Sequence, residues 1–195
     1  NGGRMTADAT SQWSSARIAV ATNGQILVVG GCKQTAISGW CATKLFANGT
    51  ADRQFASSGA LRITQEALLG VTVNRVRVTT SGEVIAAAAC SYKHSNPGYV
   101  VPEVFACLVK MTTGGQVLTT GADGLPPRLP FPGGYAAPVF VTYVDASILS
   151  DGSTVFAFNC TNDTSGNLTQ QRLSLCVTKA LSSGAIDSSY GANGY

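Results

Sequence analysis

The chain has 195 residues, of which 45% are hydrophobic and 12% are charged, and its formal net charge is +3. This hydrophobic content argues against intrinsic disorder, and a chain of this length can bury the core of one domain. The small, scattered positive charge argues against a nucleic-acid partner, and the longest apolar runs, such as 84–90, are too short to span a membrane.

Glycine and cysteine recur at the same spacing in three successive parts of the chain. In each part a glycine precedes a first cysteine by eight positions: Gly24–Cys32, Gly82–Cys90 and Gly152–Cys160. A second cysteine is followed by a lysine three positions later and by a glycine eight positions later: Cys41, Lys44 and Gly49; Cys107, Lys110 and Gly115; Cys176, Lys179 and Gly184. Such a period predicts an array of similar structural units.

Each unit is expected to be a four-stranded antiparallel meander with tight glycine turns. In the first unit the β-rich runs 16–22 and 25–32 flank Asn23-Gly24, a strong hairpin signal, and the runs 40–46 and 60–64 follow. The later units contain the corresponding runs: 75–80, 83–90 and 105–111, then 146–150, 153–160 and 173–181. A further fourth strand is less clear at 139–144, and helical periodicity is essentially absent.

The cysteines fit this strand pattern, because one closes the second strand of each unit and the other opens the third. Directly opposed residues on antiparallel strands have Cα atoms about 4.5–5.5 Å apart, which lies within the range that a disulfide needs. We therefore predict three disulfides and an oxidising compartment: Cys32–Cys41, Cys90–Cys107 and Cys160–Cys176. Six reduced thiols are the alternative. No metal site is expected, because the chain has no CxxC motif and a single histidine.

The first unit contains Asn23-Gly24-Gln25-Ile26, Asp52-Arg53-Gln54-Phe55 and Gly59, and the third unit closes similarly with Asp187-Ser188-Ser189-Tyr190-Gly191. With these motifs the chain resembles the delta-60 repeat of bacterial secreted proteins. The second unit departs from the pattern, with Leu118 in place of the aspartate and a proline-rich ending: Pro126, Pro127, Pro130 and Pro132. The resemblance implies a scaffold similar to β-propeller blades, and it supplies no catalytic residues.

The predicted fold is therefore all-β, with three propeller-like blades in one repeat domain over residues 1–195; a β-trefoil is the alternative. We place repeat 1 at about 14–64, repeat 2 at about 72–130 and repeat 3 at about 139–195, with 1–13 completing a neighbouring blade. Three blades are too few for a closed propeller. The spacing of the repeats would be kept if the last residues of one chain were followed by the first residues of another. We therefore expect a head-to-tail homo-oligomer, with a dimer favoured. A fragment of a longer array is the other interpretation.

The long connections are expected to gather on one face, because in a meander the links between second and third strands and between units leave the same side. Variable polar loops of this kind carry function in many folds. Aromatic rings with polar edges suit sugars or protein partners. The candidate ligand-binding residues are Trp40, Tyr92, Lys93, His94, Asn96, Tyr99, Asn162 and Asp163.

No enzyme active site and no cofactor are expected. His94 is the only histidine, so a catalytic triad would have to be built on one loop, and Asp52 and Asp187 occupy equivalent turn positions that favour a structural role. We therefore expect an extracellular, cell-surface or periplasmic binding module, adhesin-like or lectin-like, that recognises glycans or an envelope protein. The alternatives are a polysaccharide hydrolase using Asp163 or Asp145, and a purely structural assembly domain.

Overall fold

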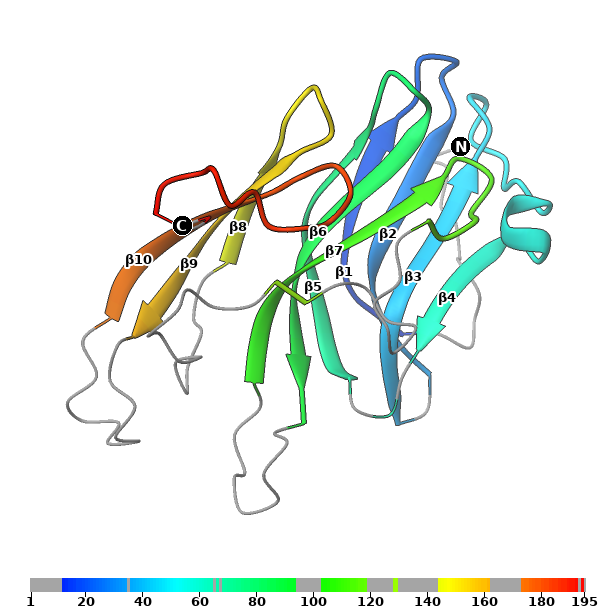
Figure 1. Ribbon diagram of the computed structural model, residues 1–195. Coiled ribbons are helices and arrows are strands. Elements are labelled where there is room, and N and C mark those ends of the chain that lie inside the picture. Colours follow the sequence, from blue (N-terminus) through cyan, green and yellow to red (C-terminus); the bar gives the residue numbers. More distant parts are fainter. Residues whose placement is uncertain are drawn as a thin grey trace.

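The computed structural model describes residues 12–34, 36–64, 66, 68–93, 103–118, 128–129, 144–161, 173–192 and 194. Within these residues the chain forms ten β strands and one short 3-10 helix. The strands make three antiparallel sheets that pack face to face, with the middle sheet between the other two (Figure 1). The predicted all-β class is confirmed.

The first sheet is the predicted four-stranded meander. Its strands pair in chain order: β1 (Gln12–Val20), β2 (Ile26–Gln34), β3 (Ile37–Leu45) and β4 (Ala60–Thr64), with the 3-10 helix η1 (Phe55–Ser57) before β4. The turn between β1 and β2 needs a glycine, because Gly24 has φ +78°, and the Asn23 side chain accepts a hydrogen bond from Gln25 N. Asn23-Gly24 therefore forms the hairpin that its sequence predicts.

The middle and third sheets have three strands each within the described residues. The middle sheet contains β5 (Leu68–Val78), β6 (Glu83–Tyr92) and β7 (Glu103–Thr112), and the third contains β8 (Val144–Ile148), β9 (Thr154–Thr161) and β10 (Leu173–Ala180). The expectation of four strands in every unit is thus met only in the first, and residues 139–143 lie outside the described part.

Two residues pair with β7 at the edge where the fourth strand was expected. Arg128 forms an isolated antiparallel bridge with Cys107, and Leu129 N donates to the carbonyl of Ala106 at 2.9 Å. Prolines stand immediately before and after this pair, at positions 127 and 130. Proline has no N–H that could donate to a strand ladder.

The connection between β2 and β3 is much shorter than expected. The strand runs expected at 25–32 and 40–46 leave a loop between them, but Lys33 pairs with Ser38 and Gln34 with Ile37, so only positions 35 and 36 lie between the strands. Strand pairing likewise continues to Tyr92 in β6. The predicted loop boundaries are therefore wrong at these two places.

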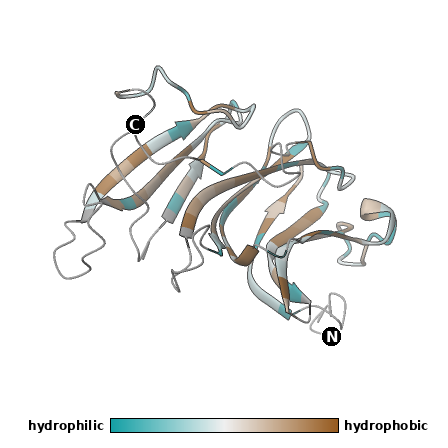
Figure 2. Cartoon of the chain, turned by 60° about the horizontal axis from the view of Figure 1, so that its bottom comes forward, coloured by the Kyte–Doolittle hydropathy of each residue, from teal (hydrophilic) through white to brown (hydrophobic). Residues whose placement is uncertain are grey.

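Two apolar interfaces hold the sheets together, and the middle sheet contributes to both. In β6 the side chains of Val84 and Ala86 belong to the core shared with the first sheet, whereas Ile85 and Ala87 belong to the core shared with the third. Successive residues of a strand point to opposite faces, so an uninterrupted apolar run results when both faces are covered. Figure 2 shows hydrophobic residues along the strands of all three sheets.

All three predicted disulfides are confirmed. The Cα–Cα distances are 5.8 Å for Cys32–Cys41, 6.1 Å for Cys90–Cys107 and 5.8 Å for Cys160–Cys176. The paired cysteines are diagonal and not directly opposed, because Cys41 lies opposite Gly30 and Cys32 opposite Gly39. We attribute the short diagonal to the right-handed twist of the sheet, which brings one diagonal of each strand pair closer than the other.

Removing the central disulfide should destabilise the protein markedly. Cys90→Ala combined with Cys107→Ala opens a bridge between residues 17 positions apart, so we expect a loss of about 3 kcal/mol in the free energy of unfolding. Chemical denaturation of the oxidised wild type and of the double variant measures this difference. A loss below about 1 kcal/mol would contradict a major stabilising role of the bridge.

Candidate binding face

The two ends of the sheets are built differently. At the upper end in Figure 1 lie the tight turns between β1 and β2, β5 and β6, and β8 and β9; we call this the turn end. The connections from β2 to β3, β4 to β5, β6 to β7 and β9 to β10 leave the opposite end, which we call the loop end. The predicted segregation of the longer connections to one side follows from this antiparallel order.

Carboxylates at the turn end are engaged in turn hydrogen bonds. Asp52 accepts from Gln54 N at 3.0 Å, Asp187 from Ser189 N at 3.1 Å, and Asp151 from Ser153 N at 2.9 Å. The Ser153 hydroxyl holds the pKa of the Asp151 carboxyl below its usual range. These contacts confirm the structural role predicted for Asp52 and Asp187.

The repeated lysines neutralise carboxylates at the same end. Lys44 lies 2.8 Å from Asp52 and Lys179 lies 3.0 Å from Asp187. The hydrogen bond from Lys44 is the largest cause that holds the pKa of Asp52 below its usual range. For Asp187 the Ser189 hydroxyl lowers the pKa most, followed by Lys179.

The second unit keeps the lysine but changes its partner. Because Leu118 replaces the aspartate, Lys110 instead lies 2.9 Å from Glu83, at the start of β6. All three repeated lysines are thus paired, and the turn end carries little uncompensated charge from them. Asp52 and Asp187 are consequently committed to folding contacts.

The loop end is anchored by the disulfides. Cys32 lies two residues before the end of β2, Cys90 two before the end of β6, and Cys160 one before the end of β9. Each connection from a second to a third strand therefore starts from a covalently joined strand pair. This arrangement gives the loops a rigid base whatever their own lengths.

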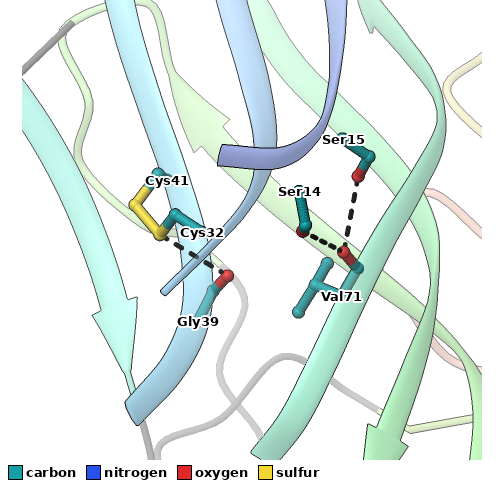
Figure 3. Close-up of a disulfide and its surroundings, with 6 residues drawn as sticks. All are labelled: Ser14, Ser15, Cys32, Gly39, Cys41 and Val71. Carbon is teal, nitrogen blue, oxygen red and sulfur yellow. Dashed lines mark hydrogen bonds between the residues drawn. A yellow bond between two sulfur atoms is a disulfide. The ribbon is translucent and has the colours of Figure 1, made fainter. Parts of the chain in front are cut away.

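Hydrogen bonds between sheets fix the same end laterally. The hydroxyls of Ser14 and Ser15 in β1 both donate to the carbonyl of Val71 in β5 at 3.4 Å, close to the Cys32–Cys41 bridge (Figure 3). Ser38 donates to the carbonyl of Leu69 at 2.8 Å. These directional contacts hold the first sheet in register with the middle one.

The candidate residues that the structure describes do not all lie on this surface. Trp40 is 1% exposed in β3 and Tyr92 is 2% exposed in β6, and both belong to the core between the first and middle sheets. Their predicted placement in surface loops is wrong, because strand pairing extends through both positions. Lys93 is exposed directly after β6. His94, Asn96, Tyr99, Asn162 and Asp163 lie outside the described residues.

An arginine at the loop end was not anticipated. The Arg128 guanidinium lies 4.6 Å from the ring centre of Tyr92 and 5.8 Å from that of Phe105, and the two rings meet edge to face at 5.9 Å. Arg128 is itself exposed. Comparison of the repeats could have found it, because Arg62 lies opposite Cys41 as Arg128 lies opposite Cys107.

Exposed basic groups complete this face: Lys33 and Lys93 are exposed near the ends of β2 and β6. An open hollow of about 470 Å³ lies elsewhere, beside η1 and the first residues of β4, and is lined by Ala56, Ser58, Ala60, Leu61 and Arg62. Ammonium and guanidinium groups can donate hydrogen bonds to hydroxyl, carboxylate or sulfate oxygens.

Within the described ranges, no three His, Cys, Asp or Glu side chains are arranged to hold a metal ion. The same part of the chain contains no helix with the length and apolarity needed to cross a membrane. No family model matches the sequence, and searches of curated proteins and of solved structures found no similar protein. Function is therefore inferred from the chain itself.

The turn-end carboxylates should make stability fall in acid. The folded-state pKa of Asp52, Asp151 and Asp187 is lowered, so their contribution is fully present well above the unfolded-state pKa of about 3.9. It is lost as the pH falls from there through the folded-state values. We expect a melting temperature that is level between pH 7 and about 5 and drops below about 4.

Asp52→Asn should lower the melting temperature at pH 7 and flatten the fall in acid. The exposed Glu66, which makes no ion pair with another described residue, provides the control Glu66→Gln, which should follow the wild-type curve. Thermal unfolding followed by circular dichroism between pH 2.5 and 7 tests both variants. A parallel fall in wild type and Asp52→Asn would contradict a stabilising role of this carboxylate.

Proposed function

We propose that this protein is a secreted or cell-surface binding module, adhesin-like or lectin-like, that recognises glycans through its loop end. The observation that carries the proposal is the contrast between the two ends. At the turn end the repeated lysines and their carboxylate partners are paired with one another and with the turns. The loop end is cross-linked by disulfides and presents exposed basic side chains. A rigid scaffold with variable loops at one end is a common design for recognition.

We further propose that the three sheets are blades of a propeller-like scaffold, as the resemblance to the delta-60 repeat implies. The first strands β1, β5 and β8 pack successively against one another, and the sheets stack face to face without closing into a barrel. This stacking favours blades over a β-trefoil. Because closed propellers have about four to eight blades, we propose that copies of the chain share one ring.

Three disulfides within an all-β chain are typical of an oxidising compartment. We propose in addition that the protein is exported to the cell surface or the medium, and the periplasm is the alternative location. Few charged residues, at 12% of the chain, and a surface that relies on Ser, Thr and Asn are compatible with an exported β protein.

The described loop-end residues favour an acidic glycan. Lys93 and Arg128 are both exposed, and Arg128 lies over the aromatic pair Tyr92–Phe105, which holds the guanidinium in place. A fixed guanidinium can bind a sugar carboxylate or sulfate through two parallel hydrogen bonds. Neither residue needs a metal ion for such binding.

The alternatives receive less support. For a hydrolase, Asp145 was one candidate carboxylate, but it lies 3.4 Å from Arg75 in an ion pair between β8 and β5. Asp163 lies outside the described residues. A purely structural assembly domain would leave the loop end without a ligand, and an envelope protein in place of a glycan is a further outcome of the test below.

A glycan array probed with the oxidised 195-residue chain tests this function. We expect binding to glycans that carry carboxylate or sulfate groups, with affinity reduced about tenfold or more by Lys93→Ala or Arg128→Ala. This reduction corresponds to the loss of one charge-assisted hydrogen bond of about 1.5–3 kcal/mol.

Arg53→Ala is the matched control, because it removes one positive charge from an exposed residue at the turn end. It should leave glycan affinity unchanged, and unfolding curves should show that all three variants remain folded. A hydrolysis screen on the glycans that bind separates a lectin from an enzyme. Absence of glycan binding, or equal losses in all three variants, would overturn the proposal.

A further inference from the structure

The three sheets pack on one another through equivalent positions. We call the face of a sheet that packs on the next sheet in the sequence its forward face, and the opposite face its backward face. The forward face of the first sheet contains Leu27, Val29, Trp40 and Ala42, and the equivalent positions of the middle sheet are Ile85, Ala87, Ala106 and Leu108. All eight side chains are buried.

The forward face of the third sheet is apolar, but it is not part of a core. Counting from the turn glycine and from the second cysteine gives its members as Val155, Ala157, Leu175 and Val177. None of the four belongs to either of the two cores, and Leu175, the counterpart of the buried Trp40, is 69% exposed. This face therefore has the composition of a core surface, although no sheet of the described ranges follows the third one.

The backward face of the first sheet is exposed in the matching way. Ile18 and Val20, which precede the turn glycine of β1 by six and four positions, are 66% and 63% exposed. The equivalent residues of β8, Ala146 and Ile148, are buried in the core shared with the middle sheet. The two outer sheets therefore present the two kinds of apolar face that meet inside the stack.

A loop of the first unit also docks on a turn of the second. Ala56 N, in η1, donates to the carbonyl of Gly114 at 2.9 Å, and a Cβ added at Gly115 would lie 3.0 Å from the Phe55 ring. Phe55 is 1% exposed and belongs to the core between the first and middle sheets. The loop after the third strand of the first unit is thus packed against the turn after the third strand of the next.

The third unit forms the same loop. Tyr190 stands three positions after the turn aspartate, as Phe55 does in the first unit. Gly194 N donates to the carbonyl of Tyr190 at 2.8 Å, as Gly59 N donates to that of Phe55 at 2.7 Å. Tyr190 is nevertheless only half-buried. The loop is thus preformed in the third unit, where no described unit follows to bury its aromatic side chain.

The first unit offers the turn that this loop requires. Its equivalent of Gly114-Gly115 is Asn48-Gly49, and the backbone is similar, with φ +81° at Gly49 and +89° at Gly115. Gly115 is buried, whereas Gly49 is exposed and a Cβ added there would meet no atom of the described residues within 4 Å. The first unit therefore has this turn without a loop on it, and the third unit has the loop without a turn.

A second copy of this chain is the partner that these surfaces fit. The middle sheet stands between the first and third sheets (Figure 1), so the third sheet cannot reach the backward face of the first sheet of its own chain. A contact between two different faces of identical chains repeats from copy to copy and closes when the rotation completes a ring. Two copies bring twice three sheets, and six lies within the about four to eight blades of closed propellers.

We propose that the forward face of the third sheet of one copy packs on the backward face of the first sheet of a second copy. Tyr190 then packs on the turn Asn48-Gly49 of the second copy, and Leu175 and Ile18 become buried in the contact. Burial of the apolar faces drives the association, and the loop on the turn fixes its register. The inference rests on the blade arrangement proposed above, names the surfaces through which copies share one ring, and is independent of glycan binding.

Two matched glycine substitutions test the turn contact. Gly49 and Gly82 have φ of +81° and +80°, and a Cβ added at either position would meet no described atom within 4 Å. Asparagine tolerates positive φ, so Gly49→Asn and Gly82→Asn should fold alike. Only Gly49 lies in the proposed contact, where the equivalent Gly115 has no room for a side chain.

Light scattering after gel filtration measures the outcome. The wild type and Gly82→Asn should have a mass of about 40 kDa, twice the 20.0 kDa of the chain, and Gly49→Asn should have half that mass. Thermal unfolding followed by circular dichroism verifies that both variants are folded. Equal masses for the two variants, or a wild-type mass of one chain at micromolar concentration, would overturn the proposal.

Mixing two blocked variants tests whether two different faces meet. Ile18→Asp blocks the backward face of the first sheet, and Leu175→Asp blocks the forward face of the third. Both positions are exposed in the chain, so each variant should fold and have the mass of one chain. An equimolar mixture should recover the mass of two chains, because each variant supplies the face that is intact. The control Leu69→Asp, at an exposed leucine of the middle sheet, should assemble alone like the wild type.

A mixture that keeps the mass of one chain would overturn the pairing of these two faces. So would assembly of either blocked variant alone, because like faces would then meet. The glycan measurements separate these results from the proposed function. Monomeric Gly49→Asn protein that still binds glycans would show that the loop end works without assembly, whereas an assembled wild type without glycan binding would leave the interface standing.

Discussion

Each sheet of this protein is apolar on both faces, and this constraint shapes the rest of the structure. In β6 the neighbouring residues Val84 and Ile85 point to opposite sides, and both are fully buried because another sheet lies on each side. Apolar surface left in water costs about 25 cal/mol for each Å². A unit of this kind is therefore stabilised only within a stack, where every added sheet covers one face and presents another.

Apolar packing alone would not fix how the sheets sit against one another, because it has no direction. Polar groups supply the direction: Ser14, Ser15 and Ser38 bond to backbone carbonyls of β5. Gly31 makes this approach possible, since a Cβ at that position would lie 1.9 Å from the carbonyl oxygen of Val71. The stack is thus held by non-directional burial and set in register by a few hydrogen bonds at the loop end.

The sequence predicts the parts of this structure that local rules govern. Turn glycines need positive φ, and the disulfides need neighbouring strands, so the hairpins and all three cysteine pairs could be predicted. Strand ends were less predictable, because pairing through Trp40 and Tyr92 depends on burial from a neighbouring sheet and not on the residues themselves. The bridge between Arg128 and Cys107 was likewise not predictable from local rules, because it joins residues that are distant in the sequence.

The candidate site was harder to predict for a related physical reason. The same residues recur in each unit where each unit needs the same structural feature: a turn, a cross-link, a lysine–carboxylate pair or a packed face. The loops between second and third strands have no structural feature in common, and accordingly they differ in length and share no residue pattern. Arg128 shows the difference, because its place opposite Cys107 is repeated by Arg62, whereas Tyr92 and Phe105, on which it stacks, correspond in sequence to Gln34 and Gly39 of the first unit. Residues that repeat in every unit are therefore those that hold the stacked sheets together. Residues that differ between units are the ones through which a single unit can bind a ligand.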